Sequence, residues 1–91
     1  MAHRLKKTVA EAFELPMDVM MDMPLIHMTG TLMVTVENHR GIVEYTDRKI
    51  RIDSAAGPIE ITGIHMMIVT IEREQIVIRG SIGGIQMGGG R

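Results

Sequence analysis

Apolar and polar residues alternate along most of the chain from residue 25 onward, a period of two that is typical of half-buried β-strands. The clearest instance is residues 49–53 (KIRID), and turn-forming residues interrupt the alternation at short intervals. We therefore predict an all-β domain over residues 25–86, a small antiparallel β-sandwich of about seven short strands. A short β-solenoid is the alternative, because Ile-x-Ile triplets begin at residues 50, 59 and 76.

The two ends of the chain follow other patterns. Apolar residues recur at helical spacing over residues 1–15, which predicts one amphipathic helix. Pro16 ends this helix, because the residue before a proline is disfavoured in the α conformation. Residues 16–24 have a proline at each border and no clear period, so we predict an extended connector. Residues 87–91 are rich in glycine and predict a flexible tail.

A polar segment, residues 37–41 (ENHRG), separates two apolar runs and predicts a hairpin. Asn38 and Gly41 are the turn-forming residues: the Asn38 side chain can bond to its own backbone, and Gly41 can adopt a positive φ. This arrangement would display His39 and Arg40 at the tip of the turn.

The composition narrows the possible functions. Aromatic residues make up 2% of the chain, too few to form a platform on which nucleic-acid bases stack. The net charge of −1 provides no field that attracts nucleic acid. The absence of cysteine excludes disulfides, thiolate catalysis and cysteine-ligated zinc. With no signal peptide and no transmembrane stretch in the pattern, we expect a cytoplasmic protein.

The chemically reactive side chains form no catalytic or metal-binding pattern. The four histidines lie in four separate predicted elements, without a second ligand at a suitable spacing. Ser54 and Ser81 have no histidine nearby in the sequence. Gly80, Gly83 and Gly84 lack the ending of a phosphate-binding loop and instead predict a bulge or a close backbone approach. We expect a protein that is not an enzyme and uses no cofactor or metal.

The chain carries more apolar surface than a small domain with one helix would cover. Residues 64–71 are apolar on both faces, which predicts a strand covered on both sides. Methionines are concentrated in the connector and the first strands, where they could fill an aromatic-poor core. They could equally form a protein-binding or self-association surface. The methionines assigned to this candidate interface are Met20, Met21, Met23, Met28 and Met33.

Two motifs resemble a known family. Residues 15–24 (LPMDVMMDMP) combine a leucine-proline pair, an aspartate-valine pair and a second proline, and residues 37–42 (ENHRGI) follow the glutamate-asparagine-histidine-arginine-glycine pattern. Both are similar to the YabP/YqfC family of sporulation proteins, with the closest likeness to the YqfC branch over residues 10–82. The resemblance implies a β-sandwich without enzymatic activity that serves spore development in the mother cell.

Such a protein would act as a structural or adaptor module that binds itself, as a homo-oligomer, or binds another sporulation protein in solution or at a membrane. His39 and Arg40 are candidate interface residues, since arginine is a common interface anchor, but turn formation alone also explains them. An alternative function is peripheral membrane binding, in which Arg4, Lys6 and Lys7 lie beside the apolar stripe of the first helix.

Overall fold

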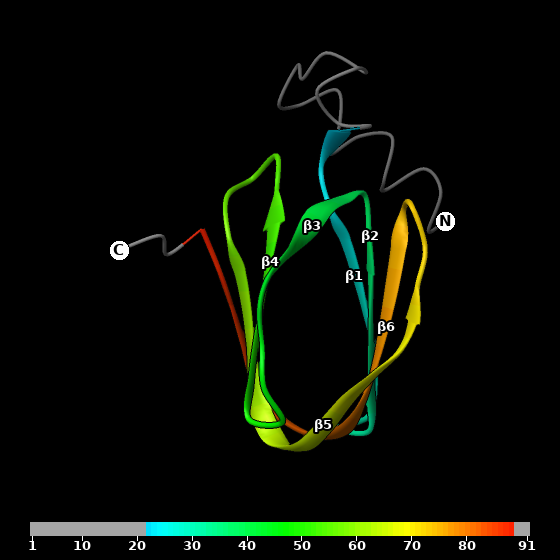
Figure 1. The fold of residues 1–91 in the computed structure, drawn as a ribbon, viewed down its shortest axis with the longest axis vertical. Coiled ribbons are helices and arrows are strands. Elements are labelled where there is room, and N and C mark those ends of the chain that lie inside the picture. Colours follow the sequence, from blue (N-terminus) through cyan, green and yellow to red (C-terminus); the bar gives the residue numbers. More distant parts are fainter. Residues whose placement is uncertain (1–21, 89–91) are drawn as a thin grey trace, which may run out of the picture.

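The computed structural model describes residues 22–88, which form one antiparallel sheet of six strands (Figure 1). The all-β prediction is confirmed for these residues. The strands lie side by side in the order β1-β2-β6-β5-β4-β3. Their bounds are β1 Leu25–Thr29, β2 Met33–Glu37, β3 His39–Tyr45, β4 Lys49–Ser54, β5 Ile59–Ile71 and β6 Gln75–Met87.

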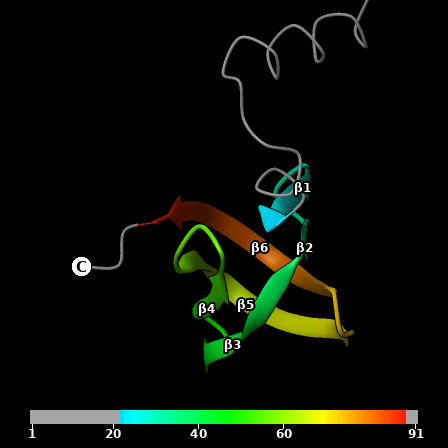
Figure 2. The ribbon, with the colours of Figure 1, turned by 90° about the horizontal axis from the view of Figure 1, so that it is seen from above.

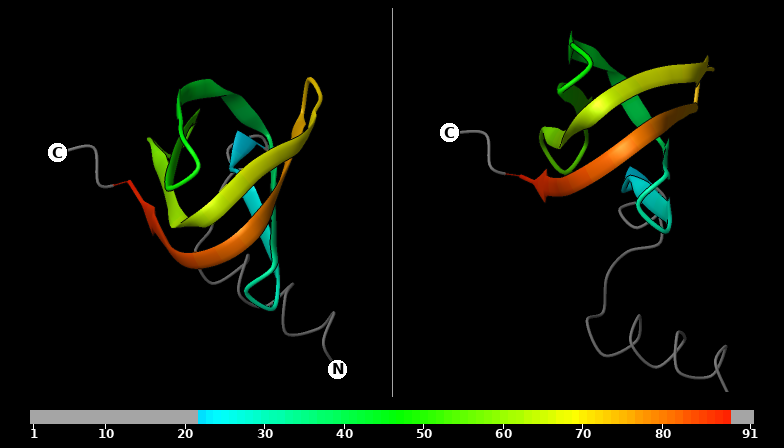
Figure 3. Two further views of the ribbon diagram at one scale, coloured as in Figure 1. Left: turned by 60° about the horizontal axis from the view of Figure 1, so that its bottom comes forward. Right: turned by 90° about the horizontal axis from the view of Figure 1, so that it is seen from below.

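The long hairpin of β5 and β6 bends and divides the sheet into two facing layers (Figures 1 and 3). The start of β6 pairs with β2, whereas the start of β5 pairs with β4. Because β5 and β6 are antiparallel, these two starts lie at opposite ends of the hairpin. The first layer therefore contains β1, β2 and the hairpin residues 67–79. The second layer contains β3, β4 and the hairpin residues 59–62 and 82–87.

A single aliphatic core lies between the two layers. In β2 and β4 the buried residues occupy every second position, because successive side chains point to opposite faces. Met66 and Ile82 close the core at the bend. The fully buried side chains are Val34, Val36, Ile76 and Ile78 from the first layer, and Ile50, Ile52, Ile59 and Ile61 from the second.

Two glycines make the bend possible. A Cβ atom on Gly63 would collide with the carbonyl oxygen of Ser81, and one on Gly80 would lie 2.7 Å from the Cα atom of Met66. Gly80 also has a φ of 151°, which L side chains rarely adopt. The predicted close backbone approach at Gly80 is therefore confirmed. The register shifts between Thr62 and Gly63 and between Ile64 and Met67 place bulges at the same point, which bend the strand further.

The prediction of a β-sandwich with about seven strands is wrong in its connectivity and its strand count. One sheet of six strands supplies both layers, because the segments on either side of Gly63, and those on either side of Gly80, are continuous strands. The solenoid alternative is also wrong for residues 22–88, since every strand pair is antiparallel. The helix predicted over residues 1–15 and most of the connector lie outside the described residues.

The last strand reaches one residue beyond the predicted end of the β domain. β6 ends at Met87, and the backbone N–H of Gly88 donates a hydrogen bond to the carbonyl oxygen of Pro58 at 2.9 Å. The start of the predicted tail is thus attached to the turn that connects β4 to β5.

Candidate protein-binding surface

Residues 37–41 connect the two layers and do not form the predicted hairpin. β2 pairs with β1 and β6, whereas β3 pairs with β4, so the chain crosses from one layer to the other at Asn38. Asn38 lies between β2 and β3, whereas Gly41 lies within β3. Asn38 has a φ of 64° and Gly41 a φ of 119°, and both values lie in the region that asparagine and glycine tolerate best.

Hydrogen bonds attach this crossing to the turn between β5 and β6. The backbone N–H of Asn38 donates to the carbonyl oxygen of Glu74 at 2.8 Å, and its side-chain amide donates to the carbonyl oxygen of Met23 at 3.0 Å. The ring of His39 makes two further contacts, with the carbonyl oxygen of Glu72 and the N–H of Gly41. The crossing is therefore held on both sides by segments distant in the sequence.

The contacts of His39 determine its tautomer. The N–H of Gly41 can only donate, so Nδ1 of His39 accepts this hydrogen bond, at 3.0 Å. In the neutral ring the proton then lies on Nε2, which donates to the carbonyl oxygen of Glu72 at 2.9 Å. Both ring nitrogens thus have partners within the chain.

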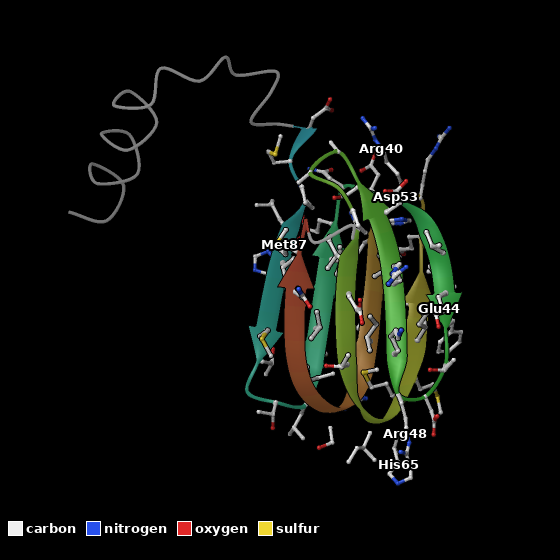
Figure 4. All side chains as sticks on the ribbon, turned by 90° about the vertical axis from the view of Figure 1, so that its left-hand side faces the viewer. Arg40, Glu44, Arg48, Asp53, His65 and Met87 are labelled. Atoms are coloured by element: carbon white, nitrogen blue, oxygen red, sulfur yellow. The ribbon has the colours of Figure 1, made fainter. Side chains whose placement is uncertain are left out.

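Arg40 is exposed next to this half-buried histidine. Figure 4 shows Arg40 and Asp53 at one end of the molecule, and Arg48 and His65 at the opposite end. The Arg40 side chain is exposed, whereas the His39 ring forms hydrogen bonds within the fold. The interface role assigned to both residues stays a prediction.

The candidate interface methionines do not share one face. Met28 lies opposite Val34 on the core side of the sheet and is 48% exposed because β1 is at the sheet margin. Met33 lies opposite Arg79 on the outer side and is half-buried. Met23 precedes β1 and is exposed. Five candidate residues lie outside the described part of the chain: Met20, Met21, Arg4, Lys6 and Lys7.

A further group of exposed apolar residues lies on β3 and the second half of β5. The hydroxyl of Tyr45 accepts a hydrogen bond from the N–H of Ile68 at 3.0 Å, and the N–H of Met66 donates to the carbonyl oxygen of Asp47 at 2.9 Å. Together with the His39–Glu72 contact, these bonds connect β3 and the turn after it to the second half of β5 and the turn after it. The exposed apolar residues of β3 and this half of β5, which we call the β3/β5 patch, are Val43, Tyr45, Met67, Val69 and Ile71. Tyr45 and Ile71 pair with the core residues Ile50 and Ile76, whereas Met67 pairs with Arg79 on the outer side.

The prediction that residues 64–71 are covered on both sides is wrong within residues 22–88. Met66 is buried and Ile68 packs against the core, but Ile71 is 63% exposed and Met67 59%. The sequence pattern correctly marked this strand as unusually apolar. It did not distinguish a strand whose side chains the domain covers from one that keeps exposed apolar side chains.

The outer face of the second layer is charged. Glu60 accepts a hydrogen bond from Arg51 at 3.2 Å and lies 3.9 Å from the Lys49 ammonium. Glu44 lies opposite Arg51 on the neighbouring strand. Charged side chains therefore cover this face, in contrast to the β3/β5 patch.

The described residues place no reactive group in a catalytic arrangement. The hydroxyl of buried Ser54 donates to the carbonyl oxygen of Gly57 at 2.6 Å and accepts from the N–H of Ala56, so it stabilises a turn. No group of three or more metal-binding side chains occurs in residues 22–88. Across the same range, no helix has the length and apolar character needed to cross a membrane.

Comparisons with known proteins identify relatives of this sequence. A sequence model of the YabP family matches residues 23–91, a range that includes all six strands. The chain is also 38% identical over 80 residues to the uncharacterized protein YqfC of Bacillus subtilis (strain 168), covering 88% of this chain and 86% of that protein. No solved structure matches the chain.

Proposed function

The chain belongs to the YabP family, and from this membership we propose that it is a non-catalytic structural or adaptor protein of spore formation. It acts in the cytoplasm of the mother cell by binding another protein or copies of itself. The role in sporulation rests on the family resemblance of its two motifs, residues 15–24 and 37–42. Binding as the mode of action rests on the surface of the domain.

The observation that carries this proposal is the β3/β5 patch. Five large apolar side chains are exposed along β3 and the second half of β5, and exposed apolar surface beyond what a soluble monomer usually shows often marks a site of protein interaction. Arg40 is exposed on β3. It is a second candidate contact residue, because arginine is a common interface anchor.

The proposal is tested by substitution within the patch. We expect Met67→Lys to weaken capture of the partner from sporulating cells by roughly tenfold or more, since buried interface anchors contribute on the order of 1–2 kcal/mol. Thr62→Lys is the matched control, because Thr62 is also exposed on β5 but lies on the charged face. Identification of the captured protein by mass spectrometry, and its reciprocal capture of this chain, complete the experiment.

Two outcomes would contradict the proposal. If the wild-type chain has the mass of one copy in solution and captures no specific partner from sporulating cells, it does not act by binding proteins. Turnover of a substrate by the purified chain would contradict the non-catalytic role.

A further inference from the structure

We propose that the outer edge of β1 pairs antiparallel with β1 of a second copy, which joins two six-stranded sheets into one continuous sheet. This inference rests on the proposed function and deepens it, because it assigns the self-association to one strand. The two copies are related by a twofold axis through His27.

The sheet leaves the outer edge of β1 unpaired within residues 22–88. The strand order places β1 at one margin of the sheet and β3 at the other, and Figure 2 shows them on opposite sides of the molecule. β1 forms its ladder with β2 alone. Its other edge therefore presents backbone N–H and C=O groups that a further strand can pair with.

The other margin of the sheet carries features that prevent such pairing, and β1 does not. β3 has two register shifts against β4, and it contains Arg40 and Glu44. Its free side is also attached to the neighbouring layer through His39 and Tyr45. Bulges, charges and covering contacts are the usual protections of edge strands. In contrast, β1 pairs with β2 in unbroken register and contains no Lys, Arg, Asp or Glu.

The sequence of β1 is complementary to itself in the antiparallel direction. With His27 opposite His27 of the second copy, Ile26 lies opposite Met28, and Leu25 opposite Thr29. Ile26 and Met28 are on the core side of the sheet, since they pair with Val36 and Val34. Pairing therefore extends the apolar face of the first layer across the junction and covers the exposed part of Met28.

The outer side of the junction contains no unfavourable charge pair. Nε2 of His27 lies 3.5 Å from a carboxylate oxygen of Glu37 in the same chain, so the ring faces an acidic side chain of its own chain. Leu25 and Thr29 are neutral. The five residues of a second β1 strand can therefore pair with the free backbone groups and cover the apolar side chains. They also bring no like charges together.

A cysteine substitution tests this geometry directly, because the chain contains no cysteine. Residues directly opposite in an antiparallel pair have Cα atoms about 4.5–5.5 Å apart, within the range of about 4.4–6.8 Å found in disulfides. We expect mild oxidation to convert full-length His27→Cys mainly to a covalent dimer. Leu25→Cys and Thr29→Cys should each fail to do so alone, whereas the double variant Leu25→Cys/Thr29→Cys should cross-link, because those positions face each other.

Several results would overturn the inference. Asp53 is an exposed residue away from β1. If Asp53→Cys cross-links to the same extent as His27→Cys, the cross-links form by random collision between chains. Failure of both His27→Cys and the double variant, each with native circular dichroism, would show that the edge does not pair with itself. If the His27→Cys variant is a monomer whose new thiol resists a maleimide reagent, another part of the same chain covers the edge. If that thiol reacts in a monomer, the edge is bare.

Light scattering and cross-linking together distinguish failure of this inference from failure of the proposed function. If light scattering gives a dimer or larger oligomer but His27→Cys does not cross-link, self-association stands and the β1 junction is wrong. If the chain is a monomer that still binds an identified sporulation protein, only the β1 junction is wrong. If it is a monomer without a partner, both proposals are wrong.

Discussion

The Nε2 atom of His39 lies 2.9 Å from the carbonyl oxygen of Glu72, and this contact attaches the crossing between the two layers to the turn between β5 and β6. The same ring accepts a hydrogen bond from Gly41 at its other nitrogen. His39 and Arg40 are adjacent in the ENHRG segment, yet the histidine ring bonds within the fold whereas the arginine faces solvent. The two residues should therefore respond differently to substitution.

His39→Ala should lower the free energy of unfolding by about 1–2 kcal/mol, because it leaves the N–H of Gly41 without its protein partner and removes the shorter of two hydrogen bonds to the carbonyl oxygen of Glu72. Arg40→Ala is the control and should change stability by less than about 0.5 kcal/mol, as an exposed residue away from special features. Urea denaturation measures both. Equal effects of the two substitutions would mean that the histidine contacts do not stabilise the crossing.

Tyr45→Phe should loosen the contact between β3 and β5 without unfolding the domain. The substitution keeps the ring and removes the hydroxyl that accepts from the N–H of Ile68 at 3.0 Å, which costs on the order of 1 kcal/mol. We expect amide hydrogen exchange to accelerate at Ile68 and to be unchanged at Ile50 in β4. Unchanged exchange at Ile68 would show that this hydrogen bond does not protect the edge of β5.

Gly63→Ala should destabilise the bend strongly, because the added Cβ atom meets the backbone oxygen of Ser81. Backbone atoms cannot move aside without shifting the strand, so we expect a loss of about 2 kcal/mol or more. Gly83→Ala is the matched control, since its Cβ atom would lie 3.4 Å from the oxygen of Thr62 and needs little adjustment. Thermal unfolding of the two variants distinguishes them, and similar melting temperatures would contradict the tight bend.

Truncation of the core should show that the two layers unfold as one unit. Ile78→Ala in the first layer and Ile50→Ala in the second each remove a fully buried side chain, which costs about 2–5 kcal/mol. Because the layers share one core, each variant should unfold in a single transition detected at the same denaturant concentration by probes in both layers. Separate transitions for the two layers would contradict a common core.

The sequence allowed the core of this domain to be predicted, because local alternation determines which face of a strand is buried. Ile50, Ile52, Ile59 and Ile61 were all expected on one side of their strands, and all four are fully buried. The layer arrangement could not be predicted in the same way. It depends on which distant strands pair, and the glycines at 63 and 80 resemble strand ends when only the local pattern is considered.

The candidate surface also depends on contacts between distant segments, which a local sequence pattern does not reveal. Asn38 and Gly41 adopt positive φ values, as expected for turn-forming residues, but a hairpin and a crossing between layers place similar demands on those two positions. The exposure of Ile71 was missed because an apolar sequence is the same whether its own domain or a partner covers it. The hydrogen bond from the His39 ring to Glu72 joins positions too far apart in the sequence for a local pattern to reveal it.

The mass of the full chain in solution tests most directly whether this protein associates with itself. Light scattering over a range of concentrations should give at least twice the mass of one chain, and Met28→Lys should reduce it to the mass of one chain, because a charge then lies at the apolar junction. A wild-type chain with the mass of a single copy at every concentration would contradict self-association through β1.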